Sequence, residues 1–171
     1  MIEKFSFELH TPKIPHEKLI LVKEMHELRN HVVLKLLAYC LFHTPGLKIE
    51  VSAGMHYKPD LMVPGDHGVP QVWIDCGQVA LRKVENLAQK LRTTKVIFVK
   101  ETARELETFK KLVVKKVEHA DRLAFLAFET GFAAALASAL QRTNHFTLYD
   151  VAENVIGVAM NDEVFESALY F

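Results

Sequence analysis

Two aspartates, Asp60 and Asp75, are the residues whose type and spacing most clearly suggest chemistry. Each lies in a segment with the pattern of a β-strand, and Asp66-His67-Gly68 between them has the composition of a turn. A regular hairpin centred on that turn places Asp60 directly opposite Asp75 on one face. Cross-strand Cβ atoms lie ~4.5–5.5 Å apart, and two carboxylates at that separation repel each other. The pair therefore predicts a bound cation, and Mg²⁺ (or Mn²⁺) suits carboxylate, water and phosphate oxygens.

The same spacing also has a purely structural explanation. Asp60 would then belong to a turn after Pro59, and Asp75 would face solvent. The two explanations differ in the register of the hairpin, which a sequence defines only loosely.

The elements that would position these acids begin with a hairpin and a helix. Phe5, Phe7 and Leu9 alternate with polar residues, as in a half-buried strand, and Leu19 to Val22 predict a second strand that turns back on the first. His26 to Phe42 predicts a deeply buried helix that ends at Thr44-Pro45-Gly46.

Strands and helices then alternate along the chain. Further strands are predicted at Leu47 to Val51, Tyr57 to Val63, Val72 to Cys76, Lys95 to Val99 and Leu123 to Phe128. Helices are predicted at Leu81 to Leu91, about Ala103 to Glu118, and around Phe132 to Leu140. Strands at Phe146 to Tyr149, Val155 to Val158 and Val164 to Phe171 would close the chain as an antiparallel meander. The strand-helix-strand order implies parallel crossovers, so we expect an α/β fold with a mixed central sheet flanked by helices.

Length and charge favour one domain without a strong overall field. The chain has 171 residues, half of them apolar, which suffices for one core over residues 1–171. The 21 Lys and Arg balance 21 Asp and Glu, so a contact with nucleic acid would have to come from a local basic patch. The four lysines between Lys110 and Lys116 are such a patch, or an ordinary solvated helix face.

The sequence also predicts a cytoplasmic protein without a membrane segment. Met1 to Phe5 lacks the pattern of a signal peptide, and no apolar run approaches the ~20 residues that a membrane helix needs. Cys40 and Cys76 lie among apolar neighbours, which is typical of reduced core thiols.

Four segments carry a resemblance to a known family. They are the helix segment with Glu27 and Val32 to Tyr39, the pair Pro59-Asp60, the segment Trp73-Ile74-Asp75-Cys76-Gly77, and the basic Arg82-Lys83-Val84. Together they resemble the YaeQ family, small bacterial proteins of unsettled activity, over nearly the whole chain. The resemblance implies a restriction-endonuclease-like core, a variant of the PD-(D/E)XK nuclease fold, with an N-terminal hairpin and a C-terminal β-meander.

The resemblance assigns roles to particular residues. Glu27 would be the helical acid of the first motif, Asp60 the aspartate of the second and Asp75 the acid of the third. Asp60 and Asp75 would bind the metal ion with the main-chain carbonyl of Cys76, and Glu27 would act through water or a second ion. Alternatively, Glu27 is an ordinary acid of a first helical turn, favoured by the helix dipole.

This sequence departs from the PD-(D/E)XK pattern at the third motif. A lysine is expected two residues after the acid, to orient the attacking water and offset charge on the phosphate, but that position is Gly77. Gln78 or Lys83 could replace it, the latter by reaching back from the following helix. The alternative for Lys83 is a solvated residue on the polar helix face.

Three functional hypotheses follow. The first is a Mg²⁺-dependent phosphodiesterase that uses Glu27, Asp60, Asp75 and either Lys83 or Gln78. The second is a catalytically weak or inactive module that keeps the nuclease-like core and binds a nucleic acid or a protein. The third is a structural role in which the meander strands pair in an oligomer, whose state the sequence leaves open. Trp73, beside Asp75, could stack on a base or fill a gap under the helices.

Overall fold

The computed structural model describes residues 1–171 and shows a mixed α/β protein that divides into two compact units. The first unit combines Met1–His43 with Phe128–Tyr170, and the second consists of Thr44–Ala127 with Phe171. The fold class was predicted correctly, whereas the single domain over residues 1–171 stays a prediction. None of the helices is long and apolar enough to cross a membrane.

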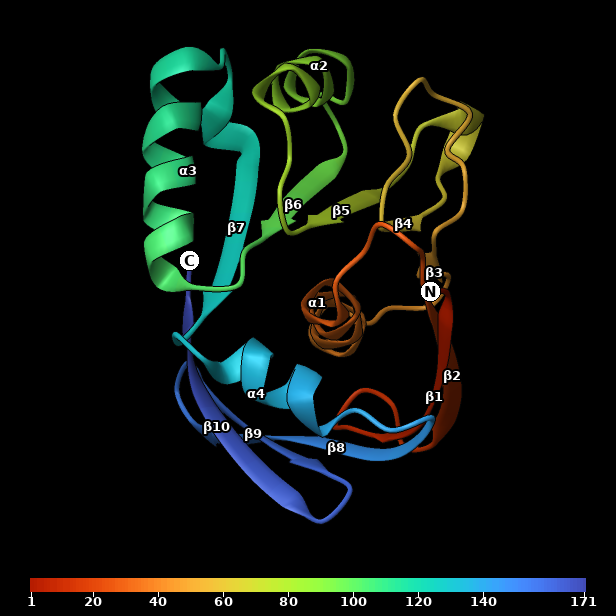
Figure 1. Cartoon of the computed structure of the whole chain (residues 1–171). Helices are drawn as coiled ribbons and strands as arrows, with labels where there is room; N and C mark the ends of the chain where they lie inside the picture. The colour runs from red at the N-terminus through yellow and green to blue at the C-terminus, as the bar shows by residue number, and fades with distance from the viewer. The chain divides into compact units, whose positions relative to one another are not determined.

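The first unit is built on five strands in the order β2-β1-β8-β9-β10 (Figure 1). Their bounds are Glu3–His10 for β1, Glu17–Lys23 for β2, Thr143–Ala152 for β8, Val155–Met160 for β9 and Glu163–Tyr170 for β10. The hairpin of β1 and β2 and the antiparallel meander of β8, β9 and β10 confirm the prediction. The parallel pairing of β1 with β8, which joins the two pieces, was not predicted.

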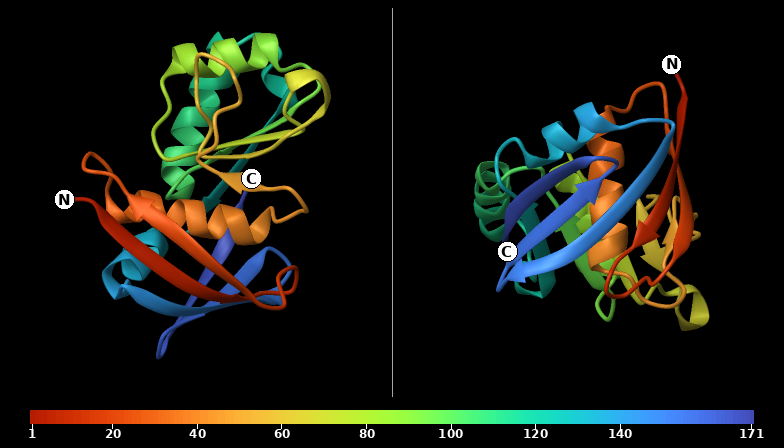
Figure 2. Two further views of the ribbon diagram at one scale, coloured as in Figure 1. Left: turned by 90° about the vertical axis from the view of Figure 1, so that its right-hand side faces the viewer. Right: turned by 90° about the horizontal axis from the view of Figure 1, so that it is seen from below.

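Two helices lie on one face of these strands, as Figures 1 and 2 show: α1 (Arg29–Leu41) and α4 (Phe132–Ala139). Every residue of α1 from Val32 to Cys40 is buried, as its nearly continuous apolar sequence predicted. One of these buried residues is Lys35, whose side chain therefore needs a partner inside the unit.

The second unit has five strands in the order β7-β6-β5-β4-β3. They are β3 (Lys48–Ile49), β4 (Leu61–Val63), β5 (Val72–Cys76), β6 (Lys95–Val99) and β7 (Leu123–Phe128). Strands β5, β6 and β7 are parallel, whereas β3, β4 and β5 are antiparallel, so the predicted crossovers are confirmed.

Helices α2 (Leu81–Lys90) and α3 (Ala103–Lys116) provide those crossovers. Both pack on the face of the strands that carries Trp73, Phe98 and Phe125. Thr102 caps α3 by accepting a hydrogen bond from the Glu105 amide at 3.2 Å. The apolar residues of α2 face this core, so the polar residues of the helix lie outside it.

Two predicted strands are shorter than their patterns indicated. The strand expected from Tyr57 to Val63 contains only Leu61–Val63, and the strand from Leu47 to Val51 contains only Lys48–Ile49. The residues between them form an irregular loop, and its side chains Ala53, Met55 and Tyr57 pack against the core beneath α2 and α3. The apolar residues of this segment therefore pack against the core from a loop, and no neighbouring strand pairs with them.

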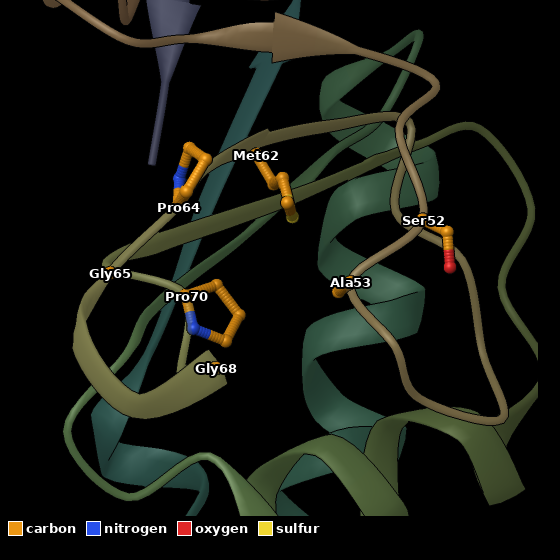
Figure 3. Close-up of a pocket in the computed structure, with 7 residues that line it drawn as sticks. All are labelled: Ser52, Ala53, Met62, Pro64, Gly65, Gly68 and Pro70. Carbon is orange, nitrogen blue, oxygen red and sulfur yellow. The ribbon is translucent and has the colours of Figure 1, made fainter.

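The connection from β4 to β5 contains the 3₁₀ turn Asp66–Gly68 at the predicted centre of the hairpin. A small cavity of about 100 Å³ lies beside it (Figure 3). Its lining residues are Ser52, Ala53, Met62, Pro64, Gly65, Gly68 and Pro70. At Gly65 the chain passes so close to itself that an added Cβ would lie 2.1 Å from the Val69 carbonyl oxygen.

Replacing Gly65 by alanine should therefore strain the hairpin that positions both aspartates. We expect the free energy of unfolding to fall by about 3 kcal/mol, because the clash is with backbone that cannot swing away. Gly54→Ala is the matched control: it meets no atom within 4 Å and should cost only about 1 kcal/mol through its positive φ. Urea denaturation of both variants would measure the difference, and equal losses would contradict the close approach at Gly65.

Candidate functional site

Strands β4 and β5 pair in the register that the sequence predicted. Leu61 lies opposite Ile74, and Met62 lies opposite Trp73. Asp60 immediately precedes β4, and its carboxylate Oδ2 accepts a hydrogen bond from the backbone amide of Cys76 at 2.8 Å. The Asp60 carboxylate is thus fixed to the end of the strand that carries Asp75.

The carboxylate of Asp75 points into the unit and is only 2% exposed. Its Oδ2 accepts a hydrogen bond from Trp73 Nε1 at 3.0 Å, and Lys83 Nζ lies 3.0 Å from each of its oxygens. The structural alternative, in which Asp75 faces solvent, is therefore wrong. Asp75 shares its strand face with Trp73, which is the face covered by α2.

Lys83 reaches this carboxylate from the first turn of α2. Its side chain is 18% exposed, so it is not the solvated residue of the alternative explanation. The ammonium also donates a hydrogen bond to the Lys58 carbonyl at 3.2 Å. It lies 5.9 Å from the ring centroid of Tyr57 and 5.8 Å from that of Trp73, within the range of a cation–π interaction. Lys83 thus occupies a position enclosed by a carboxylate, a carbonyl and two aromatic rings.

The electrostatics of the site follow from this burial. Loss of solvent raises the pKa of Asp75 above its ordinary value, and the nearby charge of Asp60 acts in the same direction. The Lys83 charge and the hydrogen bonds from Trp73 and Lys83 oppose this increase without cancelling it. The effect of Asp60 is weaker than those of burial and of Lys83, and its direction is the one expected of a neighbouring carboxylate.

A second lysine near the site, Lys100, was missed by the sequence analysis. It directly follows β6, which pairs with β5 beside Asp75, and it is only 6% exposed. Its Nζ donates a hydrogen bond to the Gly77 carbonyl at 2.6 Å and lies 3.9 Å from the Phe109 ring centroid. Burial lowers the pKa of Lys100, which the negative charges of Glu105 and Asp75 counteract.

A signal for Lys100 was present in the sequence. It is the first residue after the unbroken apolar run Val96 to Val99, and the carboxyl ends of parallel strands are where ligands bind in α/β sheets. The structure thus brings a lysine side chain to Gly77, although Gly77 has none of its own.

Two further predicted residues have simpler surroundings. Gln78 is exposed, and its side chain makes no hydrogen bond, so Lys83 is the replacement that reaches Asp75. Trp73 is completely buried, which confirms that it fills a gap under the helices and excludes stacking on a base.

Glu27 lies in the first unit, in the turn before α1, and the prediction that it sits on the helix was wrong because α1 begins at Arg29. Its Oε2 accepts a hydrogen bond from the Glu24 amide at 2.7 Å. Its Oε1 lies 2.7 Å from His31 Nδ1 and accepts a hydrogen bond from Lys35 Nζ at 3.0 Å. Burial acts to raise the pKa of Glu27, but the bonds from Glu24, Lys35 and His31 outweigh it and leave the pKa below its ordinary value.

Asp60 and Asp75 are the acids of the second unit that could bind a metal ion. No three side chains of the His, Cys, Asp or Glu type lie together where they could bind one ion. Asp60 and Asp75 are nevertheless two neighbouring oxygen donors, one of them with little solvent to stabilise its charge. Mg²⁺ binds through one or two carboxylates, with water and substrate phosphate completing its shell, so this pair fits such an ion.

Fold and site together define a class of protein: a mixed α/β protein in which two aspartates and a lysine from the next helix meet beside parallel strands. The chain matches the YaeQ protein family over residues 16–169, and it belongs to that family. No curated protein matches the sequence.

Two crystal structures of similar proteins show the same fold. The YaeQ protein from Xanthomonas axonopodis pv. citri is 18% identical, with a TM-score of 0.82, and the match covers 99% of this chain and 97% of that one. The YaeQ protein from Pseudomonas syringae is 16% identical, with a TM-score of 0.75, covering 99% and 93% respectively.

The contacts of Glu27 predict a structural role that can be measured. Glu27→Gln should lower the free energy of unfolding by about 3 kcal/mol, because it removes the carboxylate that the fully buried Lys35 ammonium contacts at 3.0 Å. The double variant Glu27→Gln with Lys35→Met should recover most of this loss. Glu107→Gln, which breaks an exposed pair with Lys111, is the control and should change stability very little. A loss no larger than in this control, measured by urea denaturation, would contradict the buried pair.

The raised pKa of Asp75 predicts how pH affects stability. The folded protein retains the Asp75 proton to a higher pH than the unfolded chain does. The resulting stabilisation is complete below the ordinary carboxyl pKa of 3.8 and is lost as pH rises through the raised pKa of the folded state. In metal-free buffer, the stability of the wild type relative to Asp75→Asn should therefore fall as pH rises over this interval. The opposite slope in urea titrations would mean that pairing with Lys83 outweighs burial.

Proposed function

We propose that this protein is a metal-dependent phosphodiesterase of the PD-(D/E)XK type in which Lys83 replaces the lysine absent at Gly77. The observation that carries the proposal is the contact of the Lys83 ammonium with both oxygens of Asp75. A lysine next to an acid at the rim of a sheet places one positive charge where a phosphate would approach the carboxylates.

Asp60 and Asp75 would hold the metal ion, with the main-chain carbonyl of Cys76 as a further ligand. A bound Mg²⁺ or Mn²⁺ would polarise a phosphoryl oxygen and make water a better nucleophile. The hydrogen bond from the Cys76 amide keeps the Asp60 carboxylate turned toward β5. The indole of Trp73 holds Oδ2 of Asp75 in the same way, so both acids are oriented before an ion arrives.

Lys83 would neutralise negative charge on the phosphate and orient the attacking water. Its enclosed position limits its movement, which lowers the entropy lost in positioning that charge. Lys100 adds a second buried positive charge beside Gly77. Glu27 belongs to the first unit, where His31 and Lys35 contact its Oε1, and the proposal assigns it no contact with the ion held by Asp60 and Asp75.

A phosphodiester of a nucleic acid is the substrate that this arrangement favours. On α3, Lys110 and Lys111 already contact Phe171 and Glu107, whereas Lys115 and Lys116 are exposed and could contact phosphates. We place the protein in the cytoplasm, where the free and buried thiols of Cys40 and Cys76 would stay reduced.

A second candidate function is a binding module with little turnover. It is favoured by the Lys83–Asp75 ion pair itself, because an acid already neutralised by lysine has less need of a metal ion. Such a module would bind its partner equally well with and without divalent metal.

Calorimetric titration with Mn²⁺ and Mg²⁺ would test the metal site before any natural substrate is known. We expect wild-type protein to bind the metal, and Asp60→Asn to bind it about ten-fold or more weakly. With Mn²⁺, hydrolysis of bis(4-nitrophenyl) phosphate should fall about 100-fold in Lys83→Met, because the variant lacks the positive charge that would stabilise the transition state. Metal affinity should not fall in that variant, because Asp75 loses its competing cation.

Lys90→Met is the matched control, since Lys90 is exposed on the same helix, and it should hydrolyse the diester as the wild type does. Wild-type protein that binds neither metal would contradict the phosphodiesterase and support the binding module. Equal hydrolysis by Lys83→Met and Lys90→Met would remove Lys83 from the mechanism.

A further inference from the structure

The loop between β3 and β4 carries two neighbouring aromatic side chains, His56 and Tyr57. The rings of His56 and Tyr57 meet edge to face, with centroids 4.8 Å apart and an angle of 70° between their planes. His56 is exposed, and Tyr57 is partly buried because it packs against the core beneath α2 and α3. One ring is thus anchored, while its neighbour remains open to solvent.

These rings are connected to the acidic site through a single cation. The Lys83 ammonium lies within cation–π range of Tyr57 and forms the ion pair with Asp75. It also binds the carbonyl of Lys58, the residue after Tyr57. Three residues after Tyr57 the chain reaches Asp60, so the aromatic pair and the carboxylates belong to one local structure.

Two exposed cations are sequence neighbours of the residues in this site. Lys58 follows Tyr57, and Arg82 precedes Lys83, whose ammonium lies 5.9 Å from the Tyr57 ring centroid. Aromatic rings beside cations are the two components that proteins use to bind single strands, since bases stack on the rings while the cations attract phosphates. Trp73 cannot take this role because it is completely buried.

We propose that His56 and Tyr57 form a stacking site for an unpaired base next to the phosphate that meets Asp60 and Asp75. The link to hydrolysis rests on the proposed function, whereas the stacking itself does not. A base inside a duplex is already stacked on its neighbours, and a phosphoester without a nucleobase has no ring to stack. The aromatic pair therefore selects single-stranded nucleic acid over both.

Binding in the presence of chelator tests the stacking site separately from catalysis. The probes are a dye-labelled dodecamer of deoxythymidine, an abasic strand of the same length, and the thymidine strand in a duplex with its complement. Fluorescence anisotropy with the full-length protein should give an affinity about ten-fold higher for the thymidine strand than for the other two.

Variants of the rings then assign this preference. Tyr57→Leu and His56→Ala should each lower the affinity for the thymidine strand toward that of the abasic strand, without changing abasic binding. Tyr57→Phe keeps the ring and should bind as the wild type does. Tyr170→Leu, at another partly exposed tyrosine, is the control and should have no effect. Thermal melting identifies any variant that no longer folds. If Tyr57→Leu does not fold, the test of the stacking site rests on the loss of thymidine affinity in His56→Ala and its retention in Tyr57→Phe.

Two results would overturn the stacking site: equal affinity for thymidine and abasic strands, or an equal loss for both strands in Tyr57→Leu. A thymidine preference that depends on Tyr57 without any hydrolysis in Mn²⁺ would retain the stacking site and reject the phosphodiesterase. Hydrolysis of the thymidine strand that does not respond to Tyr57→Leu would do the reverse.

Discussion

The ion pair between Lys83 and Asp75 is the interaction on which the candidate site depends. A carboxylate that is 2% exposed is costly to ionise, and a second carboxylate nearby increases the cost. The ammonium of Lys83 offsets it from a helix rather than from the strand, because Gly77 cannot supply a side chain. The same ammonium holds the Lys58 carbonyl and lies beside Tyr57, so one cation joins β5, α2 and the loop before β4.

The Lys83–Asp75 pair balances the charge of a buried carboxylate within the protein itself. A buried ion pair adds little net stability, because the cost of removing both charges from water offsets much of their attraction. Glu27 and Lys35 show the contrasting case, in which a fully buried lysine and three contacts to one carboxylate hold a turn before α1 in place. Two acids that looked alike in sequence thus have different surroundings, because Asp75 pairs with a partly exposed lysine and Glu27 with a fully buried one.

Most elements could be predicted because their signals are local. The buried helix α1, the amphipathic helix α2 and the apolar strands β5, β6 and β7 each follow from periodicity over a few residues. The register of β4 against β5 was predicted because the turn residues Asp66 to Gly68 mark the centre of the connection, and the structure has a 3₁₀ turn there. The failures occurred where a pattern had two physical causes. Tyr57 was predicted to begin a strand, but it packs against the core from the loop before β4.

The sequence by itself determined the mixed α/β class, the family resemblance, and the pairing that brings Asp60 to the end of the strand with Asp75. These depend on neighbours in the chain. Only the tertiary structure decided that Lys83 reaches Asp75, that Lys100 turns to Gly77, and that Trp73 is enclosed. Those outcomes depend on which face of a strand a helix covers and on how far a flexible side chain extends. These contacts join residues that are not related by the period of a helix or a strand. The sequence pattern therefore does not reveal them, and the packing of the elements decides which ones form.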